Sequence, residues 1–271
     1  MNYRMTGLLL SFALLAGCGG SGSGSSGGSG TGGGQAPTVD DDGVTAGACL
    51  GPAMQMGDTL TTRWRFDFDD GFNRSQSVDQ QDYTLVSVEI FNDQEVLRFN
   101  STVETLEILV GPPDAQLGTA ESWTYRQQVA PYVIHIYGTF TNDTSVVFTP
   151  PIVRRFDLNP GESFSSAYEA TTTASMLPAP STVSIESTVT YVGRERVNVP
   201  AGSILTCRFE EVQNARNLTL DGDITTTGTW TFWWAVGSGA LVKSELYIDD
   251  NPTPRERFEL IAAEYNGNTI H

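Results

Sequence analysis

The chain is poor in the residues that carry out most enzymatic chemistry. It has only 2 histidines and 3 cysteines among 271 residues. No H-E-x-x-H or Cys-x-x-Cys motif occurs, and no G-x-S-x-G elbow follows the N-terminal glycine–serine tract. These absences argue against a zinc protease, a thiol redox enzyme and an α/β-hydrolase. We predict no cofactor, no metal site and no enzymatic activity.

The remaining candidates for chemistry are isolated. His135 lies between two isoleucines in a stretch that alternates like a strand, and such a histidine is usually an ordinary sheet residue. The acidic residues Asp67, Asp69 and Asp70 lack the ligand spacing of a calcium loop. A pair of catalytic carboxylates among the 32 acidic residues would not be visible in the sequence. The alternative function is therefore an envelope hydrolase or glycan-active enzyme that uses surface carboxylates.

Positive charge is also scarce. The chain has 15 basic and 32 acidic residues, which gives a formal net charge of −17 at pH 7. The resulting field repels the phosphates of nucleic acids and anionic lipid headgroups. We predict no nucleic-acid partner, and a domain that a membrane holds only through a covalent lipid.

The N-terminus carries a targeting signal instead of a membrane span. The apolar run Met5–Ala16 is too short to cross a bilayer. It ends at Leu15-Ala16-Gly17-Cys18, which resembles the bacterial lipobox. In that family the signal is cut before the cysteine, which receives a diacylglyceryl group and an acyl chain such as palmitate. The resemblance implies a signal peptide over residues 1–17 and lipid attachment at Cys18; an ordinary secretory signal is the alternative.

The residues that follow predict a flexible tether. Gly19–Gly34 is almost entirely glycine and serine, a composition that cannot bury apolar surface. We assign residues 18–58 to a lipidated, disordered tether and residues 59–271 to one folded domain. Because Gly19 and not aspartate follows the cysteine, the resemblance implies the outer membrane, with the domain in the periplasm or at the cell surface.

The folded domain shows a period of two almost throughout. Leu60, Trp64 and Phe66 alternate with polar residues, and residues 183–191 repeat the pattern with abundant threonine. Sheets with so many strands tend to curl or split. We predict an all-β domain with a curved antiparallel sheet (a half-barrel, open barrel or sandwich) and little helix. Only Asn100–Val110 is compatible with either a short capped helix or a strand.

The C-terminal part carries a family resemblance. Val199-Pro200-Ala201-Gly202, Cys207, Trp234 and Leu241-Val242-Lys243 resemble a pattern found in uncharacterised bacterial outer-membrane lipoproteins: a VPAG turn, then a tryptophan strand and a hairpin with a GxG turn. The resemblance implies a curved antiparallel sheet, in some cases a half-barrel similar to lipoprotein carriers. It supplies no catalytic residue.

The same stretch holds the residues that we predict to bind a ligand. Trp230, Phe232 and Trp234 fall on one face of a strand, where they either line a concave cavity for an acyl chain or apolar peptide or pack as sheet core. Trp233 falls on the opposite face, where an exposed indole would mark an interaction surface. The sequence predicts a non-catalytic binding or structural lipoprotein, with an apolar ligand or an envelope protein as its partner.

The cysteines predict one disulfide. Lipidation of Cys18 leaves Cys49 and Cys207 as an even pair in an oxidising compartment. Their bond would tie the end of the tether to the C-terminal strands. Two free cysteines, one buried and one in a linker, are the alternative.

Overall fold

The computed structural model describes residues 45–51, 53–111, 116–175, 177–219, 222–249 and 251–270. Within these ranges the regular structure is strand, apart from the short 3-10 helix η1 (Ala46–Cys49). The strands are β1 (Thr59–Asp69), β2 (Arg74–Phe91), β3 (Gln94–Val110), β4 (Thr119–Ala130), β5 (Val133–Phe140), β6 (Thr144–Arg155), β7 (Ser163–Ala174), β8 (Ser181–Val199), β9 (Gly202–Thr219), β10 (Gly222–Ala235), β11 (Leu241–Ile248), β12 (Glu256–Tyr265) and β13 (Asn268–Thr269). The predicted signal peptide, Cys18 and the glycine–serine tract lie outside the described residues.

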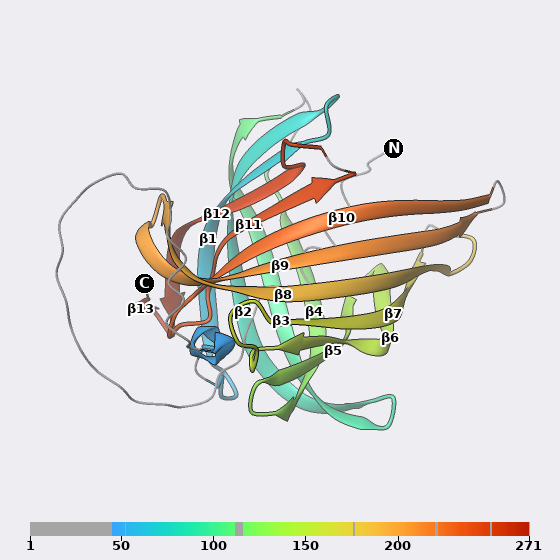
Figure 1. Cartoon of the computed structure of the whole chain (residues 1–271), viewed down its shortest axis with the longest axis horizontal. Helices are drawn as coiled ribbons and strands as arrows, with labels where there is room; N and C mark the ends of the chain where they lie inside the picture. Colours follow the sequence, from blue (N-terminus) through green and yellow to red (C-terminus); the bar gives the residue numbers. More distant parts are fainter. Residues whose placement is uncertain are drawn as a thin grey trace.

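The strands form one antiparallel sheet that closes on itself (Figure 1). Each strand pairs with its neighbour in the sequence, and β1 also pairs with β12, from Leu60↔Tyr265 to Phe68↔Glu256. Closure removes the exposed edges that an open sheet of this size would leave. The predicted all-β class, with a curved antiparallel sheet, is confirmed.

The ambiguous stretch Asn100–Val110 belongs to strand β3. Ser101 pairs with Tyr83 of β2 on one side and with Ser122 of β4 on the other. The ladder to β2 reaches Val110 and the ladder to β4 reaches Glu104, and both satisfy backbone hydrogen-bonding groups, whereas an isolated short helix is marginal in water. Tertiary pairing therefore overrides the local capping signal.

Alternation along the strands sorts side chains between the inside and the outside of the barrel. In β1, Leu60, Thr62 and Trp64 are buried, and the residues between them are more exposed. The interior also contains polar groups, for example Gln81, whose Nε2 donates to Oγ of Ser101 over 2.7 Å. Buried polar groups of this kind are tolerated because they are hydrogen-bonded to one another.

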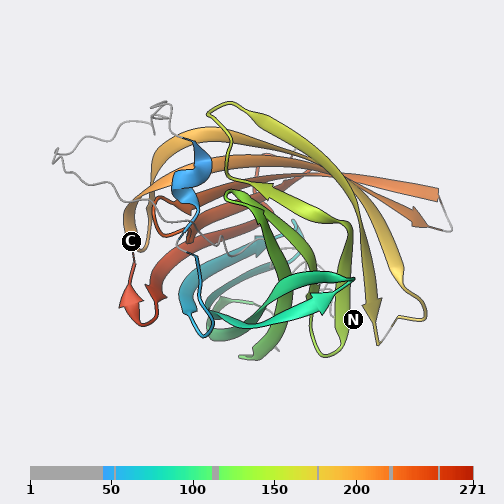
Figure 2. The ribbon, with the colours of Figure 1, turned by 90° about the horizontal axis from the view of Figure 1, so that it is seen from below.

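Helix η1 closes one end of the barrel, which we call the plugged end (Figures 1 and 2). Cys49 forms the predicted disulfide with Cys207 of β9, and their Cα atoms lie 6.0 Å apart. The backbone N–H of Ala46 donates to the carbonyl of Leu158 over 2.9 Å. Ala46 and both cysteines are completely buried, so η1 is part of the core.

The folded unit therefore begins before Thr59, where the sequence placed its boundary. Leu50 is buried in the main core cluster. Gly51 approaches the β10–β11 turn so closely that a Cβ there would lie 2.1 Å from the Ser238 carbonyl oxygen. The composition of residues 45–51 is that of a linker, but the disulfide and these contacts hold the segment against the barrel.

Strands β8, β9 and β10 are long and extend to one side of the molecule (Figure 1). The described part of the chain contains no helix with the length and apolar character needed to cross a membrane.

Candidate functional site

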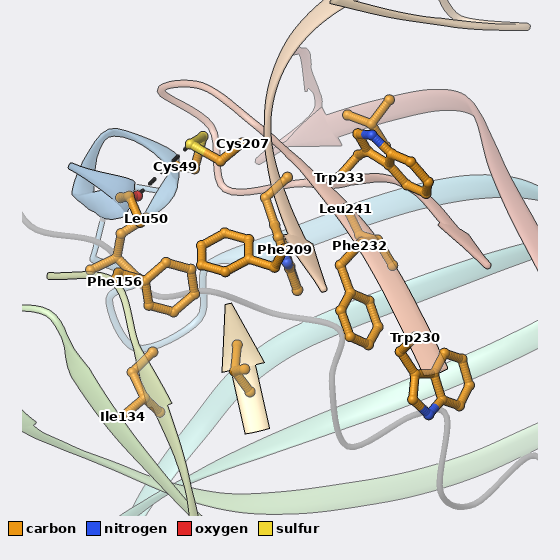
Figure 3. Close-up of a cluster of buried hydrophobic side chains, with 14 of the residues drawn as sticks. Cys49, Leu50, Ile134, Phe156, Cys207, Phe209, Trp230, Phe232, Trp233 and Leu241 are labelled. Carbon is orange, nitrogen blue, oxygen red and sulfur yellow. Dashed lines mark hydrogen bonds between the residues drawn. A yellow bond between two sulfur atoms is a disulfide. The ribbon is translucent and has the colours of Figure 1, made fainter. Parts of the chain in front are cut away.

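Alternation along β10 sends the predicted aromatic residues to both of its faces. Trp230 and Phe232 point into the barrel, where their rings stack with centroids 5.6 Å apart (Figure 3). Trp234 meets Phe156 edge to face, with centroids 6.5 Å apart. All three β10 residues are buried, so they contribute to the core and can also line an internal cavity.

Trp233 lies on the opposite face of β10 and points away from Trp230 and Phe232 (Figure 3). Its indole N–H donates to the Glu195 carboxylate, and the Lys243 ammonium lies 4.9 Å from the ring centroid. Only 7% of the residue is exposed. Trp233 is therefore a covered structural residue and contributes to neither internal cavity described below.

A cavity of about 230 Å³, partly open to solvent, lies between β6, β7, β9, β10, β11 and the start of β12. Its apolar lining includes Phe148, Ile152, Tyr168, Trp230, Leu246 and Ile248. A second cavity of about 40 Å³ is lined by Phe156, Phe209, Phe232 and Trp234, among others. The larger cavity far exceeds the space of one water molecule, and its lining suits a small apolar ligand. Three of the four predicted residues thus face cavities, with Trp230 at the larger one.

One charged side chain, Arg154, lines both cavities. Its guanidinium bonds both carboxylate oxygens of Glu211, at 3.3 and 3.1 Å. Ser187 and Gln213 also donate to Glu211, over 2.6 and 2.8 Å. A buried ion pair needs such added hydrogen bonds to offset its desolvation. The network therefore fixes a charged, hydrogen-bonded group beside the apolar walls of both cavities.

Tyr168 of β7 supplies a second polar group to the larger cavity. Its ring packs edge to face against Phe148, with centroids 5.8 Å apart. Burial, and then the negative charge of Glu211, raise the pKa of the Tyr168 phenol above its ordinary value. The hydroxyl therefore stays protonated at physiological pH and can donate a hydrogen bond.

The other residues that the sequence singled out lie elsewhere. Asp70 accepts backbone hydrogen bonds in the β1–β2 turn, and the N–H of Asn73, followed by that of Phe72, lowers the pKa of its carboxyl. His135 packs near Tyr137, and burial lowers the pKa of its imidazole. Among the described residues, no group of three or more potential ligands is placed to hold a metal ion. None of these residues lines either cavity.

Comparisons with known proteins give only remote likenesses. No protein-family model and no curated protein sequence matches the chain. A solved structure from Bacteroides fragilis, assigned as an exported protein with a YmcC-like fold, is 15% identical, with a TM-score of 0.44 over 78% of this chain and 96% of that chain. One from Parabacteroides distasonis, assigned as a lipoprotein, is 12% identical, with a TM-score of 0.48 over 78% and 96%. The hypothetical lipoprotein YmcC from Escherichia coli is 11% identical, with a TM-score of 0.35 over 82% and 90%.

The polar residues of the site were not singled out from the sequence. Glu211 follows Leu205, Cys207 and Phe209 at intervals of two, so the alternation of β9 places it on the inner face. The sequence alone therefore indicated that a charged residue, Glu211, faces the interior of the domain. Its partner Arg154 stands between Ile152 and Phe156 at intervals of two, so the same alternation places it on the inner face.

Proposed function

We propose that this protein is a lipid-anchored protein of the bacterial cell envelope whose barrel binds a small apolar molecule without altering it chemically. The cavity of about 230 Å³, walled largely by aromatic and aliphatic side chains, carries the proposal. Protein interiors are normally close-packed, whereas the apolar side chains that wall this partly open cavity lack packing partners on one side. An apolar ligand would supply the missing contacts and stabilise the folded state.

Two further features support an envelope location. The lipobox-like sequence that ends at Cys18 implies export and acylation, and Gly19 implies the outer membrane. The Cys49–Cys207 disulfide suits an oxidising compartment such as the periplasm or the cell surface. The described chain enters the barrel at the plugged end, so an anchor at Cys18 would attach to that end.

Replacing Cys18 with serine should release the domain from membranes or leave the precursor uncut, because only a thiol accepts the diacylglyceryl group. Membrane fractionation and intact-mass measurement would detect either result. The wild-type protein should sediment with outer membranes. A Cys18→Ser protein that is cleaved normally and stays membrane-bound would contradict the anchor, and wild-type protein in inner-membrane fractions would contradict the sorting.

Filling the cavity from β10 should abolish ligand binding. Gly228 lines the larger cavity, and a Cβ there would lie 3.5 Å from Cδ1 of Leu246, an ordinary contact distance. Gly228→Phe should occupy the ligand volume and weaken binding of the neutral probe N-phenyl-1-naphthylamine at least roughly tenfold, which corresponds to about 1.4 kcal/mol. Fluorescence titration of the purified domain would measure this.

Gly228→Ala is the matched control. It adds a single methyl group at the same position and should leave probe affinity nearly unchanged, while both variants keep the far-UV circular dichroism of the parent. Equal probe binding by Gly228→Phe and the parent would show that the ligand site is not this cavity. Absence of probe binding by the parent would contradict the proposed function itself.

A further inference from the structure

The polar groups that the larger cavity presents include two hydrogen-bond donors from adjacent strands. Arg154 lines the larger cavity and Glu211 does not, and the Arg154 side chain is 15% exposed whereas that of Glu211 is only 1% exposed. A guanidinium has five N–H donors, and Glu211 engages two of its nitrogens. The protonated hydroxyl of Tyr168 makes no hydrogen bond to any described residue. Both residues therefore have donors available to a ligand.

The charge around these donors is already balanced. Glu211 neutralises Arg154 within hydrogen-bond distance. A further carboxylate, that of Glu256, stands in the wall and is 7% exposed. The remaining cation of the lining, Arg255, is exposed and lies over the ring of Phe68. An anionic ligand would thus lose its hydration without gaining an unpaired buried cation, which is unfavourable in an apolar interior.

We infer that the ligand of the larger cavity is an uncharged apolar molecule with a hydrogen-bond acceptor, such as an ester, amide or ketone carbonyl, which Arg154 and Tyr168 bind. The apolar remainder packs against Trp230 and Leu246. A pure hydrocarbon leaves both donors unpaired, which costs free energy in a buried site. A carboxylate adds a negative charge that no unpaired buried cation compensates, because Arg154 is paired with Glu211 and Arg255 is exposed to solvent. This inference rests on the proposed function and names its ligand class.

Three molecules of equal chain length separate these cases: octane, methyl octanoate and octanoate. Each is used to displace N-phenyl-1-naphthylamine from the purified domain at about pH 8, where the acid is ionised. Methyl octanoate should bind roughly tenfold more tightly than either of the others. Tyr168→Phe keeps the ring and removes the donor, so it should weaken methyl octanoate roughly fivefold and leave octane unchanged.

Tyr125→Phe is the matched control, because the Tyr125 hydroxyl bonds Glu89 and is not part of the cavity lining. It should alter none of the three affinities. Tightest binding by octanoate would overturn the inference in favour of an anion site. Equal binding of octane and methyl octanoate, unaffected by Tyr168→Phe, would overturn it while leaving the proposed function standing. Failure of the probe and all three molecules to bind would overturn both.

Discussion

Removal of the Cys49–Cys207 disulfide should lower the free energy of unfolding by about 3–5 kcal/mol. The bond closes a loop across a sequence separation of 158 residues, and long loops lose the most entropy when they are cross-linked in the unfolded chain. It also holds η1, whose residues Ala46 and Cys49 are completely buried. For a domain of this size the melting temperature should fall by roughly 10 °C.

The comparison uses the domain without Cys18, so that only two cysteines are present. Cys49→Ala together with Cys207→Ala avoids the polar hydroxyls that serine would bury. Thermal unfolding of the unmutated domain with and without reductant also compares the bonded with the unbonded protein. In hydrogen exchange, the backbone amides of residues 45–51 should exchange rapidly only when the bond is absent. Alkylation of two thiols in the untreated protein, or a melting temperature that reductant does not change, would contradict the bond.

Removal of one partner of the Arg154–Glu211 pair should lower the free energy of unfolding by about 3–5 kcal/mol. Arg154→Met leaves the Glu211 carboxylate, 1% exposed, without its counter-charge. Adding Glu211→Gln removes that buried charge and keeps groups that can bond Ser187 and Gln213. The double variant should therefore lose less free energy of unfolding than the two single variants lose together, and the difference should be about 1–3 kcal/mol. Urea denaturation of the four proteins in the cycle measures the coupling.

An exposed ion pair supplies the control. Arg155 bonds Asp157 over 2.8 Å, but both side chains are more than a third exposed, at 35% and 37%. Solvent screens such a pair, so Asp157→Asn should cost no more than about 1 kcal/mol. If Arg154→Met costs as little as Asp157→Asn, then water reaches Glu211 in solution and the interior polar network is not as the structure shows it.

The sequence predicted those features of the fold that depend on residues close together in the chain, and not those that depend on contacts between distant strands. Alternation in β1 identified the inward residues Leu60 and Trp64 correctly, because a strand sends successive side chains to opposite faces. The same rule separated Trp233 from Trp230. It could not show that Trp233 is covered, since its cover comes from Glu195 of β8.

The candidate site was predicted only in part for the same reason. Trp230 was identified because aromatic residues on one face of a strand suggest either a core or a cavity wall. Phe148, Ile152 and Tyr168 come from strands more than fifty residues earlier in the chain, and only the closure of the sheet brings them opposite β10. Arg154 and Glu211 meet across the barrel, at a separation that no sequence spacing encodes.

The sequence by itself determined the all-β class, because alternation is a property of the chain, and it predicted the pairing of Cys49 with Cys207, because setting Cys18 aside leaves two cysteines. The tertiary structure decided that β1 joins β12, that residues 45–51 plug one end, and that a cavity remains inside with Arg154 at its wall. These depend on contacts between residues far apart in sequence, whose free energies are set by the packing and burial of the closed barrel and not by local preference.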